Sequence, residues 1–205
     1  MLLDAAKHLA LTRNFAGTID FIFQPAEENE GGARLMVEEG VLGKYPVEAV
    51  FGMHNWPGLP VGQFAIQPFN RSVRDQIGPA IRRVAGGACR TCGAEMKMRY
   101  ERRYPPTINS RREAEVAATA AASLVGDDNV KRDMLPSMAA EDFASFLEKK
   151  PGAYIWIGNG DAGGAVMLHN PHYDFNDAIL PLSASYWVRL AESVLSKDGA
   201  AVGRP

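Results

Sequence analysis

The chain has 205 residues, of which 46% are hydrophobic and 22% charged, so its composition is that of a folded globular protein. Lysine and arginine number 22 against 24 aspartate and glutamate, and the formal net charge of -2 gives no general attraction to nucleic acid or to an anionic membrane. The sequence contains neither the roughly 18 consecutive apolar residues of a membrane span nor a signal peptide at its start, so we expect a cytoplasmic protein.

Helix and strand patterns alternate along the chain. Apolar residues recur at helical spacing from Leu2 onward, and the β-rich run 18–23 predicts a strand that ends at Gln24 and Pro25. Further helices are expected over residues 33–39, 72–89, 114–125, 141–149 and 180–195, and further strands over residues 47–53, 61–67, 94–103, 130–134 and 153–157. This alternation predicts an α/β fold in which helices pack on a mixed sheet.

The middle of the chain is basic. Half of the lysines and arginines fall between Arg71 and Arg112, opposed by only three acidic residues. We interpret this segment as the solvated face of a helix and a strand rather than as a nucleic-acid site. Cys89 and Cys92 lie in the same segment, and their C-x-x-C spacing without a second pair favours packing at a helix end over metal or redox chemistry.

Three short segments place metal-type ligands where predicted strands end, which is where ligands usually bind in α/β sheets. They contain Glu27 with Glu28, then His54, then His169 with His172. Adjacent carboxylates in an extended segment point in opposite directions, so one can ligate an ion while the other moves a proton of the attacking water. With His54 and one of the two later histidines, the donor set suits zinc or a similar divalent ion.

Each of these residues also has a plainer interpretation. A Glu-Glu pair is usually solvated on a protein surface. His54 follows an apolar strand and is equally typical of a core histidine bonded to backbone. His172 is close enough in sequence to Asp174 for a simple loop contact. Residue chemistry alone leaves both interpretations open.

Taken together, six segments resemble the zinc amidohydrolases of hippurate, N-acyl amino acids and indole-acetyl amino acids, which belong to the metallopeptidase family that includes aminoacylase. The resemblance covers nearly the whole chain and implies hydrolysis of the amide bond of a small N-acyl amino acid. The segments are GTIDFIFQPAEEN, EAVFGMHNWPGLPVGQ, YERRYPPTIN, PSMAAEDFASFL, PGAYIWIGNGD and MLHNPHYDFNDAILPLSASYW.

Residue by residue, the resemblance implies a metal-activated water that attacks the amide carbonyl while a glutamate acts as general acid/base. The ion is expected to be zinc or manganese. The roles implied are general acid/base for Glu27, metal ligation for Glu28, His54 and His169, and substrate binding for Asn109 and Glu141.

The chain departs from the family pattern in two places. Family members carry a Cys-Gly-His-Asp-Gly-His segment before the helix that MLLDAAKHLA resembles, and a lid or dimerisation domain after the strand that VGQFAIQP resembles. We therefore expect a truncated catalytic domain formed by residues 1–68 and 109–205. Residues 69–108 are expected to be a helix-and-strand remnant of the lid.

The truncation affects the predicted metal site. Glu28, His54 and His169 alone would under-coordinate two ions, since even one catalytic zinc usually takes three protein ligands and water. We expect at most one securely held ion. The sequence leaves open a homo-oligomer, complementation by a separate N-terminal fragment, and the rival hypothesis of a catalytically inactive remnant that acts as a binding partner.

Overall fold

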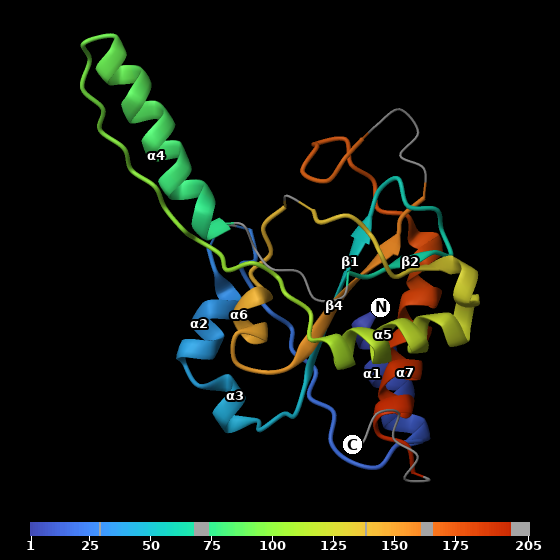
Figure 1. Ribbon diagram of the computed structural model, residues 1–205. Coiled ribbons are helices and arrows are strands. Elements are labelled where there is room, and N and C mark those ends of the chain that lie inside the picture. The colour runs from blue at the N-terminus through green and yellow to red at the C-terminus, as the bar shows by residue number, and fades with distance from the viewer. Residues whose placement is uncertain (29, 68–73, 138, 161–165, 198–205) are drawn as a thin grey trace.

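The computed structural model describes residues 1–28, 30–67, 74–137, 139–160 and 166–197. The described residues form a four-stranded sheet in the order β1-β4-β2-β3. β1 (Val50–Trp56) pairs in parallel with β4 (Gly152–Gly158), while the short β2 (Phe64–Ala65) runs antiparallel to β4 and parallel to β3 (Val130–Lys131). The predicted α/β fold with helices on a mixed sheet is confirmed (Figure 1).

One face of the sheet is covered by α5 (Arg111–Val125) and α7 (Leu180–Val194), with α1 (Leu2–Thr12) packed against α7. Side chains alternate along β4, so that Ile155 points into this core and is fully buried beside Tyr186. α5 is rich in alanine on its buried side, which lets the helix lie close to the strands. This face therefore carries the main hydrophobic core.

The opposite face is covered by three short helices, α2 (Gly32–Glu38), α3 (Val41–Lys44) and α6 (Ala144–Leu147). Their smaller core joins Phe146 to Val50 of β1. Two single-turn 3-10 helices, η1 (Asp127–Asn129) and η2 (Asp177–Ile179), precede β3 and α7. None of the helices in the described ranges is long and apolar enough to cross a membrane.

An arm, residues 74–103, projects from this body. It consists of α4 (Arg74–Thr91) and the irregular segment that returns beside it (Figure 1). Arg102 pairs with Asp75 at the base of the arm at 2.5 Å, whereas Val84 is 74% exposed. The arm falls inside the range predicted to be a lid remnant, and the domain boundaries themselves stay a prediction.

Two predicted strands are wrong. Residues 18–23 and 94–103 have no regular secondary structure. A β-rich sequence needs a partner strand to form a ladder, and no described strand pairs with either segment. Within residues 18–23, Ile22 packs on the smaller core and Phe23 is 62% exposed. Residues 94–103 run beside a helix, whose backbone groups are already hydrogen-bonded within the helix and cannot pair with a strand.

Candidate active site

Three carboxylates from two distant parts of the sequence meet beside the sheet. Glu27 precedes α2, whereas Glu141 and Asp142 precede α6. Each offers a carboxylate oxygen within 4.8 Å of the other two, and no other group of three or more metal-type ligands in the described residues is as close. We call these three residues the carboxylate cluster.

Asp142 is the buried member of the carboxylate cluster, with no exposed surface. Its Oδ1 accepts a hydrogen bond from Gln24 Nε2 at 2.5 Å, and its Oδ2 accepts one from the backbone N–H of Ala33 at 2.9 Å. Burying a carboxylate is unfavourable unless such donors compensate for lost water. Asp142 therefore joins the start of α2 to the segment before α6, and so brings Glu27 near Glu141.

Glu141 is held by a tyrosine of the sheet. The hydroxyl of Tyr154, in β4, donates to Glu141 Oε2 at 2.5 Å, and the backbone N–H of Phe143 donates to Glu141 Oε1 at 3.1 Å. Burial raises the pKa of Tyr154, and the negative charge of Glu141 raises it further. Tyr154 therefore keeps its proton and remains a donor at neutral pH.

Glu27 has the electrostatic environment of a proton-transfer group. Burial raises its pKa first, followed by the charges of Glu141, Glu28 and Asp142, while His54 acts in the opposite direction. A carboxyl group with a raised pKa takes up and releases a proton more readily near neutral pH. The structure thus places the predicted acid/base beside the predicted residues Glu28, His54 and Glu141.

The segment that carries Glu27 and Glu28 has an unusual backbone. We call it the glutamate loop (residues 25–28 and 30–32). Ala26 has a φ of +56° and Gly31 a φ of +72°, and the loop closes where Gly32 N–H donates to the carbonyl of Ala26 at 3.2 Å. A Cβ at Gly32 would lie 1.8 Å from the carbonyl oxygen of Pro25, so only glycine fits.

His54 lies in β1 and is half-buried. Its Nδ1 is 2.6 Å from the carbonyl oxygen of Asn55. A carbonyl can only accept, so Nδ1 carries the hydrogen, and in the neutral ring Nε2 presents its lone pair. A histidine fixed to backbone in this way is also oriented as a metal ligand. Both interpretations of His54 made from the sequence are compatible with this geometry.

Glu28 and His169 meet at the exposed side of the site. Glu28 Oε1 and His169 Nδ1 are 3.4 Å apart, and the two side chains are 69% and 71% exposed. Two ligands at about 2.0–2.1 Å from one tetrahedral zinc lie about 3.3–3.4 Å apart, so this pair fits a shared ion. His54 does not join the pair in a single group within 4.8 Å. The predicted three-ligand set stays a prediction.

The segment after His169 is fastened to the sheet by polar side chains. Asn55 Nδ2 donates to the hydroxyl of Tyr173. Asn159, at the end of β4, accepts from the backbone N–H of Asn176 at 3.1 Å. His172 is exposed, and its backbone N–H donates to the side chain of a neighbouring asparagine. These contacts bring the region of His169 to the end of the strand that contains His54.

Asn109 is 7% exposed and bonded to backbone groups. Its Nδ2 donates to the carbonyls of Gln67 at 2.8 Å and Tyr154 at 3.1 Å, and its Oδ1 accepts from Tyr154 N–H at 2.7 Å. Both amide hydrogens are thereby used, and one lone pair on Oδ1 is left for any other partner. The substrate-binding role implied by the resemblance stays a prediction.

Sequence reasoning missed Asp142, Tyr154 and Tyr104 as residues that shape the site. Asp142 could have been noticed as the second acid of an acidic pair next to an apolar helix. Tyr154 is the hydroxyl-bearing residue in a buried strand, and such a hydroxyl usually finds a partner. For Tyr104, whose hydroxyl bonds to the glutamate loop, the sequence gives no signal, because its partner is a backbone group 77 residues away.

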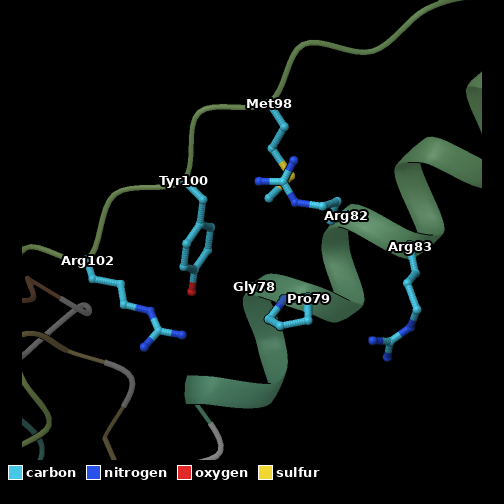
Figure 2. Close-up of a pocket in the computed structure, with 7 residues that line it drawn as sticks. All are labelled: Gly78, Pro79, Arg82, Arg83, Met98, Tyr100 and Arg102. Atoms are coloured by element: carbon cyan, nitrogen blue, oxygen red, sulfur yellow. The ribbon is translucent and has the colours of Figure 1, made fainter.

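The arm contains a hollow of about 470 Å³ between α4 and the returning segment (Figure 2). In this view Arg82 and Arg102 lie on either side of Tyr100, while Arg83 points away from them. The lining residues are Gly78, Pro79, Arg82, Arg83, Met98, Tyr100 and Arg102. No member of the carboxylate cluster borders this hollow, so it is separate from the site beside the sheet.

The mixed sheet has helices on both faces, and carboxylates and imidazoles lie beside it. This arrangement fits the class of α/β metal-dependent hydrolases. The sequence profile of peptidase family M20/M25/M40 matches residues 1–193. The chain belongs to this family, whose members are metal-dependent hydrolases.

Characterised relatives agree with this assignment. The chain is 25% identical to hippurate hydrolase of Campylobacter jejuni over 273 residues, covering 93% of this chain and 70% of the relative. It is 25% identical to N-acetylcysteine deacetylase of Bacillus subtilis, covering 87% and 67% of the two chains. The YXEP protein of Bacillus subtilis, a dinuclear metal-binding peptidase of the M20 family, superposes with a TM-score of 0.77 at 27% identity, covering 95% and 70%.

The first of these alignments is longer than the chain itself. It runs over 273 residues, whereas the chain has 205. Hippurate hydrolase therefore contains residues within the aligned stretch that have no counterpart here.

Proposed function

We propose that the chain is a metal-dependent amidohydrolase that cleaves the amide bond of N-acyl amino acids. The observation that carries this proposal is the position of Glu27, inside a carboxylate cluster and adjacent to the Glu28–His169 pair. The names of two relatives support the substrate class, since hippurate and N-acetylcysteine are both N-acyl amino acids.

In this mechanism Glu28 and His169 would hold a divalent ion, zinc or manganese, and His54 would be a further ligand. Such an ion supplies Lewis-acid polarisation of the amide carbonyl and lowers the pKa of water. Glu27 takes a proton from the attacking water and returns it to the leaving nitrogen. Its raised pKa, which burial and Glu141 cause, suits this exchange.

The chain is proposed to hold at most one ion securely, with residues 69–108 as a lid remnant between two parts of a catalytic domain. The 273-residue alignment supports the proposal of a lid remnant, because the relative has additional residues inside the matched region. We further propose a cytoplasmic protein that acts as a homo-oligomer or together with a complementing fragment.

One observation favours the rival function of a non-catalytic remnant. Glu28 and His169 are about 70% exposed, and His54 lies outside their group. A site this open gives little of the positioning and water exclusion on which hydrolases of this class depend. The remnant would bind a partner without turning over substrate.

The test is hydrolysis of hippurate and a panel of N-acyl amino acids by the purified chain with added zinc, manganese or cobalt. Glu27→Gln removes the acid/base and should lower kcat by about a thousandfold, which corresponds to about 4 kcal/mol in the barrier. Glu30→Gln is the matched control, because Glu30 is an exposed glutamate of the same loop. It should keep full activity.

Turnover that is abolished by a chelator and by Glu27→Gln, but not by Glu30→Gln, supports the proposal. If the folded protein hydrolyses none of the panel with any metal, the proposal that the chain is catalytic by itself is overturned. The rival hypothesis of a non-catalytic binding protein then remains. A Glu27→Gln variant that retains its activity overturns the assignment of the acid/base.

A further inference from the structure

The glutamate loop is bonded to a tyrosine that follows the arm. The hydroxyl of Tyr104 donates to the backbone carbonyl of Glu27 at 2.7 Å and accepts from the backbone N–H of Gly31 at 3.1 Å. One oxygen atom thus connects two points of the loop, one at the predicted acid/base and one at the residue before α2. Tyr104 is part-buried, so these bonds are partly protected from water.

The two bonds act where the loop backbone is unusual. Gly31 has a left-handed φ of +72° and Ala26 a φ of +56°, a region that alanine seldom adopts. A backbone in sparsely populated conformations persists only when its surroundings hold it. Tyr104 supplies that constraint from outside the loop, while the Gly32–Ala26 bond supplies it from within.

The position of Tyr104 is itself well defined. Pro105 and Pro106 follow it, and a residue before proline is restricted to extended backbone conformations. Arg102, two residues earlier, pairs with Asp75 at the base of α4. Tyr104 therefore approaches the glutamate loop from a segment whose backbone the following prolines restrict, and a restricted group orients a partner better than a mobile one.

We propose that Tyr104 is a positioning residue that sets the backbone of the glutamate loop, and through it the places of the Glu27 and Glu28 carboxylates. Its importance for turnover rests on the proposed amidohydrolase function. Its effect on the loop does not. The hydroxyl of Tyr104 bonds to backbone atoms of the loop, so the proposed role differs from that of the acid/base and from that of the ligands.

The experiment compares Tyr104→Phe, which removes only the hydroxyl oxygen, with Tyr100→Phe, the same change in the arm. Three quantities are measured in the full chain. They are the amide exchange rate of Gly31, the binding of Co²⁺ followed by its visible absorption, and the split between kcat and KM on hippurate.

We expect Tyr104→Phe to raise exchange at Gly31 by about tenfold, as the loss of one hydrogen bond predicts, without faster exchange in β4. Co²⁺ binding should weaken by roughly threefold to tenfold, because Glu28 follows Glu27 directly. Where turnover is present, kcat should fall by about tenfold while KM changes by less than twofold. This split is expected when the acid/base is out of position. Tyr100→Phe should change none of these.

Unchanged Gly31 exchange in Tyr104→Phe overturns the proposal, whatever the activity. So does exchange that rises equally across β4, because Tyr104 would then stabilise the fold as a whole. A wild-type chain that neither binds Co²⁺ nor hydrolyses hippurate overturns the proposed function, while the Gly31 comparison still decides the role of Tyr104.

Discussion

The body and the arm bury their apolar residues very differently. In the body, Ile155 has no exposed surface and Phe146 only 1%, and helices cover both faces of the sheet. In the arm, Val84 is 74% and Ile81 45% exposed, and α4 has only an irregular segment beside it. Burial decides how much a side chain contributes to stability, so the body should carry the free energy of folding and the arm should contribute little.

The largest effect should come from truncating a body side chain. Ile155→Ala removes buried methyl and methylene groups between β4 and the helices, which typically costs about 2–5 kcal/mol of unfolding free energy. We expect about 4 kcal/mol, measured by urea denaturation. A loss below about 1 kcal/mol would contradict the assignment of this cluster as the main core.

Asn109→Ala should rank next. The change leaves the carbonyl of Gln67 and both backbone groups of Tyr154 without their side-chain partner. An unsatisfied buried polar group costs about 1–3 kcal/mol, so we expect about 3 kcal/mol in total. Asn129→Ala is the matched control, since the side chain of Asn129 bonds to a single carbonyl. This variant should lose about 1 kcal/mol of unfolding free energy.

Asp142→Ala should cost somewhat less, about 2 kcal/mol, because two effects oppose one another. The backbone N–H of Ala33 and the side chain of Gln24 lose their acceptor, but Glu27 and Glu141 lose a repulsive neighbour. Thermal unfolding of the metal-free protein measures the sum. An increase in melting temperature would show that repulsion dominates and that the cluster is strained without a cation.

The smallest effect should appear in the arm. Val84→Ala is a truncation of the same kind as Ile155→Ala, yet it removes groups that are already in water. We expect a change within about 0.5 kcal/mol. A loss of about 2 kcal/mol or more of unfolding free energy in dilute protein would contradict the contrast between body and arm. Sedimentation at the same concentration would then show whether a second copy of the chain covers the Val84 face of α4.

The sequence predicts the helices well and the strands unevenly. The alanine-rich run over residues 114–125 predicts α5, and the amphipathic pattern over residues 180–195 predicts α7. Residues 18–23 and 94–103 have strand-like composition but no described partner strand. A helix satisfies its own backbone, whereas a strand depends on residues far away in the chain, so local pattern is a weaker guide to strands.

The site shows the same limit. Glu27 and Glu28 stand out because they are adjacent carboxylates at the end of an apolar run. Asp142, Tyr154 and Tyr104 act through partners many residues distant, and no local pattern reports such contacts. Glu27 and Glu28 could be named from the sequence, while Asp142 and the tyrosines that hold the site in place needed the fold.

The bonds of Asp142 have a consequence for how the site responds to an ion. Asp142 cross-links α2 to the segment before α6, and Tyr154 fastens Glu141 to β4, so the carboxylate side is preorganised and loses little conformational entropy on binding. Glu28 and His169 are both largely exposed and still have rotamer freedom to lose. If Glu28 and His169 ligate an ion as proposed, the entropic penalty of binding it falls mostly on that pair, and substitutions there should alter metal affinity with little effect on the melting temperature of the metal-free protein.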